Sequence, residues 1–174
     1  ATGRAANIDG LGLQAAGVRL QANGTIAVDA YSQTSVPSIY AVGDVTGRAA
    51  LTPVAIREGW YFAETVFNNN PMAVDHSEIP TAVFTEPEIG VVGQTEAEAV
   101  SQGDIDVYVS RFRPMMNSLS ARPGRMVLKL ITKKHGGKVL GVHILGPGAA
   151  EMIQLVAIAT GMGATKADFD RTIA

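Results

Sequence analysis

The sequence predicts an α+β chain in two parts, the second of them an antiparallel sheet with helices. Three observations favour this fold class. Alternating apolar residues flank Asn23-Gly24 and again the polar stretch 133–137, as in β-hairpins. Apolar residues at helical spacing fill 149–162. A stretch rich in Asn and Pro, which runs from Asn68 to about Glu78, marks the boundary between the parts.

Composition narrows the classes of function. The 174 residues are 47% apolar and carry a formal net charge of -2, which predicts a compact globular chain with no nucleic-acid partner. No apolar run is long enough to span a bilayer, and the first residues lack the layout of a signal peptide. We therefore predict no membrane partner and a cytoplasmic location. The chain has no cysteine, and its histidines share no ligand spacing, so we predict no metal site and no thiol chemistry within these residues.

In the first part, residues 17–28 predict a hairpin, and 38–42 predict a short strand that leads into Gly43-Asp44. Thr52-Pro53 then begins a helix, because Thr is a good N-cap and the missing N–H of Pro costs nothing in the first turn. The apolar residues that follow fit a largely buried helix, which ends near Asn68.

The second part alternates strands and helices. We predict strands in two short apolar runs within 81–92 and at 105–112, 126–131 and 139–145, and helices at 95–101, 149–162 and 168–173. A capping box supports the helix at 95–101, with Thr95 as the cap and Glu98 three residues later. The helix at 149–162 carries two apolar stripes, so we expect its own sheet and a second subunit to cover it. A charged substitution such as Val156→Asp is then expected to give monomeric or insoluble protein.

Two features of the first part suit a ligand. Gly43 lets a ligand approach the backbone closely, and Asp44 can accept hydrogen bonds from sugar-like hydroxyls. The helix start at Thr52-Pro53 favours a neighbouring anion through its free N–H groups and the helix dipole. Each feature alone is more often an ordinary turn or an ordinary capped helix. They lie eight residues apart, which is close enough for both to face one ligand.

Taken together, the motifs resemble the pyridine-nucleotide disulfide reductases, in the order expected for that family. Residues 38–45 (SIYAVGDV) and 51–55 (LTPVA) are similar to the family's last FAD-binding stretch. Residues 79–93 resemble the opening of its interface domain, and 141–146, 151–154 and 162–170 continue that domain. The resemblance covers essentially the whole chain. It implies a remnant of the NADPH-binding domain at 1–20, the last β-meander and helix of the FAD-binding domain at 21–75, and the interface domain at 76–174.

The resemblance also implies roles for particular residues. Gly43 and Asp44 would contact the ribityl chain of FAD, and the helix start would meet the pyrimidine end of the flavin through Leu51, Thr52 and Pro53. FAD and NADP are the cofactors of the parent protein, and we expect the chain alone not to retain them. The family's redox-active cysteine pair and its acid–base His-Pro-Thr histidine lie outside these residues, so we expect no catalytic residue here.

The histidines of this chain do not replace that acid–base residue. His143 falls in a predicted strand and is expected to be structural. His135 lies in a predicted hairpin turn and His76 in the predicted linker, where both are expected to be solvated.

Residues that bear on the substrate point in two directions. Leu51-Thr52-Pro53 is similar to the glutathione, trypanothione and large thioredoxin reductases, whereas 112–115 (FRPM) and 166–170 (KADFD) point toward the glutathione reductases. The parent would then reduce glutathione disulfide as a homodimer joined through 76–174. Trp60 and Met115 are the candidate substrate residues, because 112–116 resembles a segment that lines the disulfide pocket from the neighbouring subunit.

Trp60 is a departure from the glutathione reductases. Many of them carry an Arg at this position, which can pair with a glutathione carboxylate, and a Trp cannot form that pair. A trypanothione-type reductase therefore stays open, as does a non-catalytic dimerisation module for the chain as given.

Overall fold

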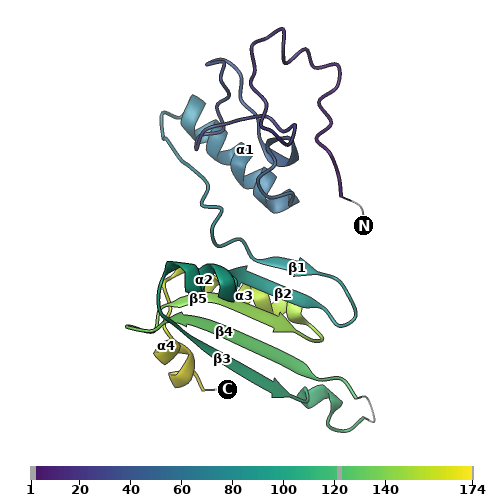
Figure 1. Cartoon of the computed structure of the whole chain (residues 1–174), viewed down its shortest axis with the longest axis vertical. Coiled ribbons are helices and arrows are strands. Elements are labelled where there is room, and N and C mark those ends of the chain that lie inside the picture. Colours follow the sequence, from purple (N-terminus) through teal and green to yellow (C-terminus); the bar gives the residue numbers. More distant parts are fainter. Residues whose placement is uncertain (1–2, 121–122, 174) are drawn as a thin grey trace. The chain divides into compact units, whose positions relative to one another are not determined.

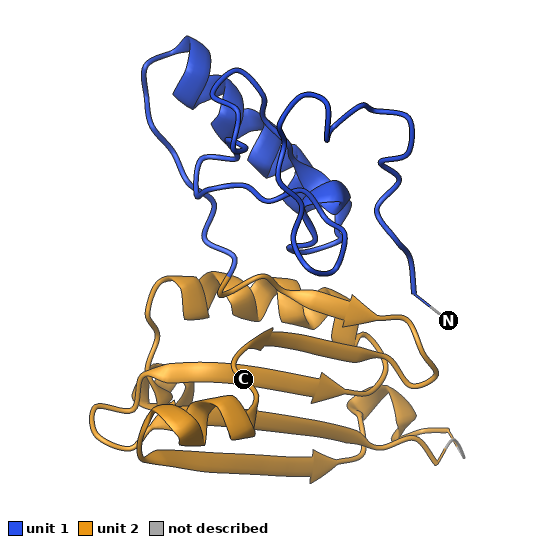
Figure 2. Cartoon of the chain, turned by 45° about the horizontal axis from the view of Figure 1, so that its top comes forward, with its two compact units in different colours: residues 1–76 blue, residues 77–174 orange. Residues whose placement is uncertain are grey.

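The computed structural model describes residues 3–120 and 123–173, and it divides into two compact units, Ala1–His76 and Ser77–Ala174 (Figure 2). Each unit has its own buried apolar cluster. Val18, Ile26 and Ala41 form the cluster of the first unit. The cluster of the second unit consists of Val92, Val139, Val142, Ile144, Ala149 and Ile153. The division of the first unit into an NADPH remnant and an FAD part stays a prediction, and Ala1 and Thr2 of that remnant lie outside the described residues.

The polypeptide of the first unit pairs through single bridges rather than through extended ladders. Leu20 lies opposite Ile26, and Gln33 lies opposite Tyr40. The predicted hairpin at 17–28 is thus present as one bridge around its turn, and the predicted strand at 38–42 is reduced to Tyr40. Residues with positive φ at Gly17, Gly24, Ser32 and Gly43 turn the chain, so only short stretches between them stay extended.

Helix α1 (Thr52–Phe67) is the main regular element of the first unit (Figure 1). Leu51 is its N-cap, and its carbonyl oxygen accepts from the N–H groups of Val54 and Ala55, one turn later, at 3.0 and 3.1 Å. Thr52 is therefore the first helical residue and caps nothing, so the prediction that it is the N-cap was wrong by one position. The helix ends at the predicted place, with Asn68 as its C-cap.

The prediction that α1 is largely buried was wrong. Its buried residues are Val54 and Glu58, whereas Ile56 and Phe67 are more than half exposed. A short 3-10 helix, η1 (Gly43–Thr46), precedes α1 and lies against its first turn.

The second unit is a five-stranded antiparallel sheet in the order β1-β2-β5-β4-β3 (Figure 1). Its strands are β1 (Thr81–Val83), β2 (Ile89–Gly93), β3 (Ile105–Phe112), β4 (Met126–Lys133) and β5 (Val139–Leu145). The longest ladder pairs β3 with β4, from Ile105 opposite Lys133 to Phe112 opposite Met126. The sheet and its hairpins confirm the predicted α+β fold class. A short 3-10 helix, η2 (Met115–Asn117), follows β3.

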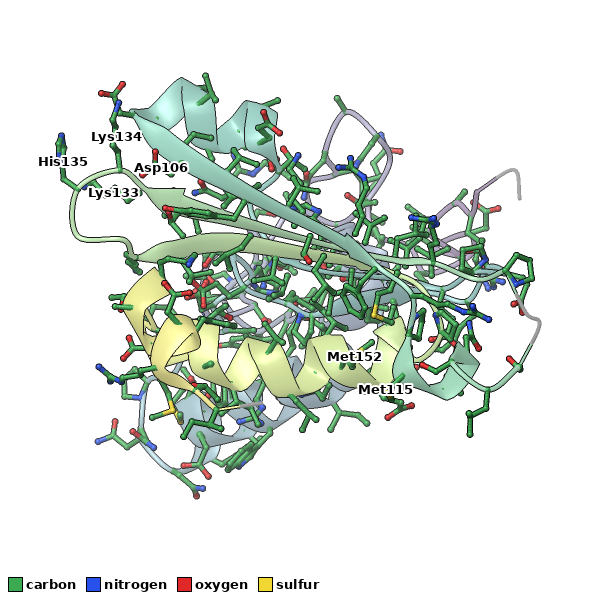
Figure 3. All side chains as sticks on the ribbon, turned by 90° about the horizontal axis from the view of Figure 1, so that it is seen from below. Asp106, Met115, Lys133, Lys134, His135 and Met152 are labelled. Carbon is green, nitrogen blue, oxygen red and sulfur yellow. The ribbon has the colours of Figure 1, made fainter. Side chains whose placement is uncertain are left out.

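Helices cover both faces of this sheet (Figure 3). Helix α3 (Ala149–Gly161) packs on the face that carries the apolar cluster, and α2 (Glu96–Gln102) lies on the other face. Alternation along β4 shows the two faces, because Leu128 and Leu130 pack against the cluster while Lys129, between them, pairs with Glu96 of α2.

Capping boxes begin two of the helices. Thr95 and Glu98 form the predicted box at the start of α2. Thr165 and Asp168 form a second one, so α4 (Lys166–Arg171) begins two residues before the predicted start at 168. No helix within the described ranges is long and apolar enough to cross a membrane.

Candidate functional site

The turn at Gly43 and Asp44 is held against the start of α1. Gly43 has a φ of 74°, and a Cβ atom there would lie 3.1 Å from the Cβ of Ala55. Glycine therefore permits both the left-handed backbone and the close approach to the helix. The carbonyl oxygen of Gly43 accepts a hydrogen bond from the Thr46 hydroxyl at 2.8 Å, and its N–H donates to Glu58 Oε2 at 2.6 Å. The backbone N–H and the carbonyl oxygen of Gly43 are thus both hydrogen-bonded.

Asp44 lies beside a polar cavity of about 460 Å³. Its side chain is exposed, and among the described residues no side chain pairs with its carboxylate. Polar residues that line the same cavity are Arg4, Asn7, Asn23, Thr25 and Arg48. Carboxylate, amide, hydroxyl and guanidinium groups together can bind a ligand that carries hydroxyls and negative charge.

The start of α1 offers a backbone donor next to this turn. The N–H groups of Val54 and Ala55 bond back to Leu51, and Pro53 has no N–H. The N–H of Thr52 has no backbone acceptor among the residues that the structure describes. The structure thus brings the Gly43–Asp44 turn and this helix start into one neighbourhood of the first unit.

A buried carboxylate, Glu58, joins this neighbourhood and was missed by the sequence analysis. Its side chain is 1% exposed, and its Oε1 lies 3.3 Å from Arg48 Nη1 and 2.8 Å from His76 Nε2. His76 is thus engaged and mostly covered, so the prediction that it is solvated was wrong. The available signal was the position of Glu58 four residues after the apolar Val54, on the same face of the helix, because a carboxylate is rarely buried without a partner.

The other histidines agree with the predictions. His143 lies in β5, where its Nε2 is 3.0 Å from the carbonyl oxygen of Gln94 in a structural contact. His135 is exposed at the hairpin turn between β4 and β5. Within the part of the chain that the structure describes, no group of three or more His, Asp or Glu residues is placed to hold a metal ion. The lack of a metal site stays a prediction.

Trp60, a candidate substrate residue, lies exposed on α1 with the Arg57 guanidinium 5.0 Å from the centre of its ring. A cation over an aromatic face is a favourable contact. The side-chain amides of Asn70 and Asn68, and then the Trp60 indole, bond to the Glu64 carboxylate and lower its pKa below its ordinary value. Trp60 therefore contacts the Arg57 guanidinium through its ring and the Glu64 carboxylate through its indole N–H.

Met115, the second candidate substrate residue, begins η2 in the second unit. It is 86% exposed, and its neighbour Met116 is also largely exposed. The two candidate substrate residues therefore belong to different units, and their roles stay predictions.

Helix α3 presents one of its two apolar stripes to solvent. Leu155, Ile158 and Met162 are 69%, 58% and 83% exposed. Val156, in contrast, packs against the buried cluster of its own unit.

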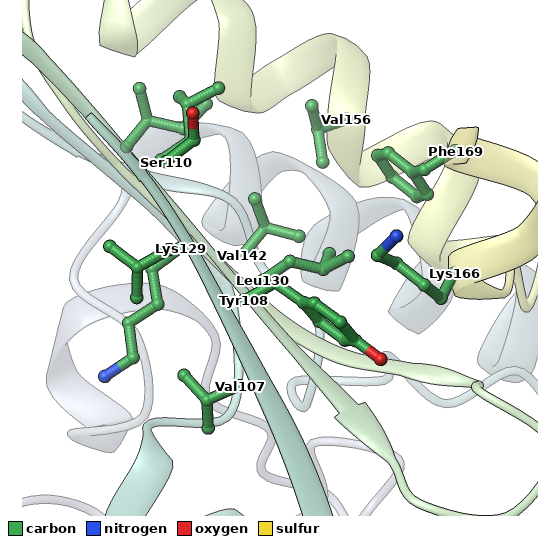
Figure 4. Close-up of a pocket in the computed structure, with 12 residues that line it drawn as sticks. Val107, Tyr108, Ser110, Lys129, Leu130, Val142, Val156, Lys166 and Phe169 are labelled. Atoms are coloured by element: carbon green, nitrogen blue, oxygen red, sulfur yellow. The ribbon is translucent and has the colours of Figure 1, made fainter. Parts of the chain in front are cut away.

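Val156 also borders an apolar cavity of about 510 Å³ between the sheet and helices α3 and α4 (Figure 4). Tyr108 and Phe169 line this cavity, and the Lys166 ammonium lies 4.6 Å from the centre of the Tyr108 ring. A substitution at Val156 therefore affects both the core and this cavity. A substitution at Leu155 affects mainly the outer surface of α3.

Comparisons with known proteins confirm the resemblance. The dimerisation-domain model of the pyridine nucleotide-disulphide oxidoreductases matches residues 79–174, and a second model of the same family matches residues 1–59. Glutathione reductase, chloroplastic/mitochondrial, of Pisum sativum is 51% identical over 99% of this chain and 32% of its own length. Glutathione reductase of Nostoc sp. is 50% identical over 99% of this chain and 40% of its own length.

A trypanothione reductase is almost as similar. The enzyme of Leishmania donovani is 49% identical over 94% of this chain and 34% of its own length. The chain spans between 32% and 40% of the length of these three curated relatives. Because one family model covers more than half of it, the chain belongs to the pyridine nucleotide-disulphide oxidoreductases.

Proposed function

We propose that this chain is the C-terminal part of an NADPH-dependent flavoprotein that reduces glutathione disulfide. The observation that carries the proposal is the Gly43–Asp44 turn, packed against the start of α1 and bordering a polar cavity. The similarity to glutathione reductases along almost the whole chain supports the same conclusion.

The residues present fit FAD as the bound group. The carboxylate of Asp44, which pairs with no side chain in the described part of the chain, can accept hydrogen bonds from the hydroxyls of a ribityl chain. The backbone N–H at Thr52 and the positive end of the α1 dipole can stabilise negative charge on a ring placed beside Leu51, Thr52 and Pro53. FAD, when bound, supplies the electron transfer from NADPH toward a disulfide. The chain contributes binding and orientation, and the cysteines that react with the disulfide lie outside it.

The proposed enzyme is a homodimer joined through the second unit. The match to a dimerisation-domain model and the exposed stripe of α3 support this assembly. A helix stripe of large apolar side chains is stabilised when a second copy covers it. We propose that the chain alone keeps this pairing without catalysis, as a dimerisation module, and that the enzyme is cytoplasmic.

Trypanothione disulfide is a second candidate substrate, which Trp60 favours. Trp60 cannot pair with a glutathione carboxylate as an Arg would, and the trypanothione reductase of Leishmania donovani is 49% identical over 94% of this chain. Met115, exposed in the second unit, is the other residue that we propose to contact the disulfide.

The test uses the complete reductase that carries this chain. A visible absorption spectrum comes first, and a flavin band at full occupancy is expected. NADPH oxidation is then followed with glutathione disulfide and with trypanothione disulfide, and a higher kcat/KM is expected with glutathione disulfide. Protein that purifies and folds without a flavin, or that oxidises NADPH with neither disulfide, would contradict the proposal. A higher kcat/KM with trypanothione disulfide would favour the second candidate.

A further inference from the structure

The buried carboxylate of Glu58 carries an inference about how the proposed flavin site is held in shape. The residue is 2% exposed on a helix whose other residues are, apart from Val54, at least partly solvent-accessible. A buried ion pair is weak evidence for stability, because apolar residues of similar volume often stabilise a protein as well or better. The contacts of Glu58 indicate a role in geometry instead.

Three segments of the first unit meet at this carboxylate. Its Oε2 accepts from the N–H of Gly43 in η1, at 2.6 Å. Its Oε1 lies within reach of Arg48, in the loop after η1, and of His76, at the end of the unit. Arg48 also donates to the backbone carbonyl of Asp29, so the network extends to a fourth segment.

The bond to Gly43 is the contact that bears on the proposed site. Gly43 directly precedes Asp44 and has a φ of 74°. Because glycine adopts positive and negative φ about equally well, the residue itself does not fix this conformation. The N–H of Gly43 bonds to Glu58 and its carbonyl accepts from Thr46, so the peptide groups on both sides of the Gly43 Cα, the second of which leads to Asp44, are held in one orientation. Such preorganisation lowers the ordering cost of binding a ligand.

We propose that Glu58 is a positioning residue for the flavin site, which sets the backbone of Gly43 and through it the direction of the Asp44 carboxylate. This inference rests on the proposed function. Among the described residues that line the polar cavity, Asp44 and Arg48 are present and Glu58 is not. Glu58 therefore acts through its neighbours and not by contact with the ligand.

The first test is a double-mutant cycle on FAD affinity in the complete reductase. Apoprotein is titrated with FAD, and flavin fluorescence gives the dissociation constant for the wild type, Glu58→Gln, Asp44→Asn and the double variant. Glu58→Gln preserves the size of the side chain and removes its charge. We expect its FAD dissociation constant to rise about tenfold to a hundredfold, because the charged acceptor is lost and the amide NH2 group must face either the Gly43 N–H or the Arg48 guanidinium. In the double variant we expect no further loss beyond Asp44→Asn, because the two residues act as one unit.

A second readout concerns the bond itself and needs no flavin. In the ¹⁵N-labelled 174-residue chain, a short N–H to carboxylate bond places the Gly43 amide proton downfield and protects it from exchange. Glu58→Gln is expected to move this proton upfield and to speed its exchange. If Glu58→Gln does not fold, Glu58→Asp carries both tests, because it keeps the charge and withdraws the carboxylate from Gly43.

The outcomes separate this inference from the proposed function. A wild-type apoprotein that binds no FAD would overturn the proposed function. A wild type that binds FAD, with a Glu58 variant within about twofold of its dissociation constant, would overturn only the role of Glu58. Additive losses in the double variant would do the same, because they would make Glu58 a general structural residue.

Discussion

Replacing Leu155 by Glu on α3 is expected to dissociate the proposed dimer of this chain without unfolding it. Leu155 is 69% exposed, whereas the neighbouring Ile153 is buried in the core of the unit. Full burial of a leucine side chain stabilises by about 1.5–3 kcal/mol, so covering the exposed fraction contributes about 1–2 kcal/mol in each copy. A two-fold interface uses the same surface twice, which gives about 2–4 kcal/mol for the pair. The dimer dissociation constant is therefore expected to rise about 30- to 700-fold.

Sedimentation velocity over a range of concentrations measures this constant, and circular dichroism checks that the variant is folded. Val100→Glu is the matched control. Val100 is an apolar residue of α2 that is 58% exposed, and α2 lies on the opposite face of the sheet from α3. A folded Leu155→Glu protein with the dissociation constant of the wild type would refute the reasoning. Dissociation caused by the control alone would move the interface to the α2 face.

Leu155 replaces Val156 as the residue at which a charged substitution tests the dimer. Because Val156 packs against the buried cluster of its own unit, Val156→Asp introduces a charge next to the core and lowers the free energy of unfolding. Loss of dimers in that variant would not separate dissociation from unfolding. The exposed stripe separates them, since its side chains make few contacts within their own copy.

Three further predictions follow from other contacts. Gly90→Ala is expected to destabilise the chain by about 1–3 kcal/mol in urea unfolding, because its Cβ would lie 2.5 Å from a backbone carbonyl oxygen of α3. Gly59→Ala, where nothing lies within 4 Å, is the control and is expected not to destabilise. Hydrogen bonds within the capping boxes lower the pKa values of Glu98 and Asp168 from ordinary values of 4.5 and 3.8. The two carboxylates therefore stabilise the fold fully above their ordinary pKa values, and this stabilisation is lost as the pH falls through their lowered pKa values in the folded chain. The urea midpoint is expected to fall in acid, and to fall less in Glu98→Gln. In the complete reductase, Trp60→Arg is expected to lower the KM for glutathione disulfide by about tenfold, and an unchanged KM would count against Trp60 as a substrate residue.

The elements of the second unit could be predicted from the sequence because their signals are local. The span of β3 and the capping box at Thr95 and Glu98 depend on residues that are near in the chain. The family could also be recognised locally, because its motifs are short and occur in a defined order. In the first unit the same rules predicted strands at 17–28 and 38–42, where frequent chain reversals leave single bridges.

What the tertiary structure alone decided are the contacts between residues far apart in the chain. Glu58 meets Gly43 across 15 residues and His76 across 18, and no local pattern relates these positions. Both stripes of α3 are apolar in sequence, yet Met152 and Val156 pack on the sheet, whereas the stripe of Leu155, Ile158 and Met162 faces solvent. Sequence patterns report which side chains leave water, whereas the partners that they meet depend on the path of the whole chain.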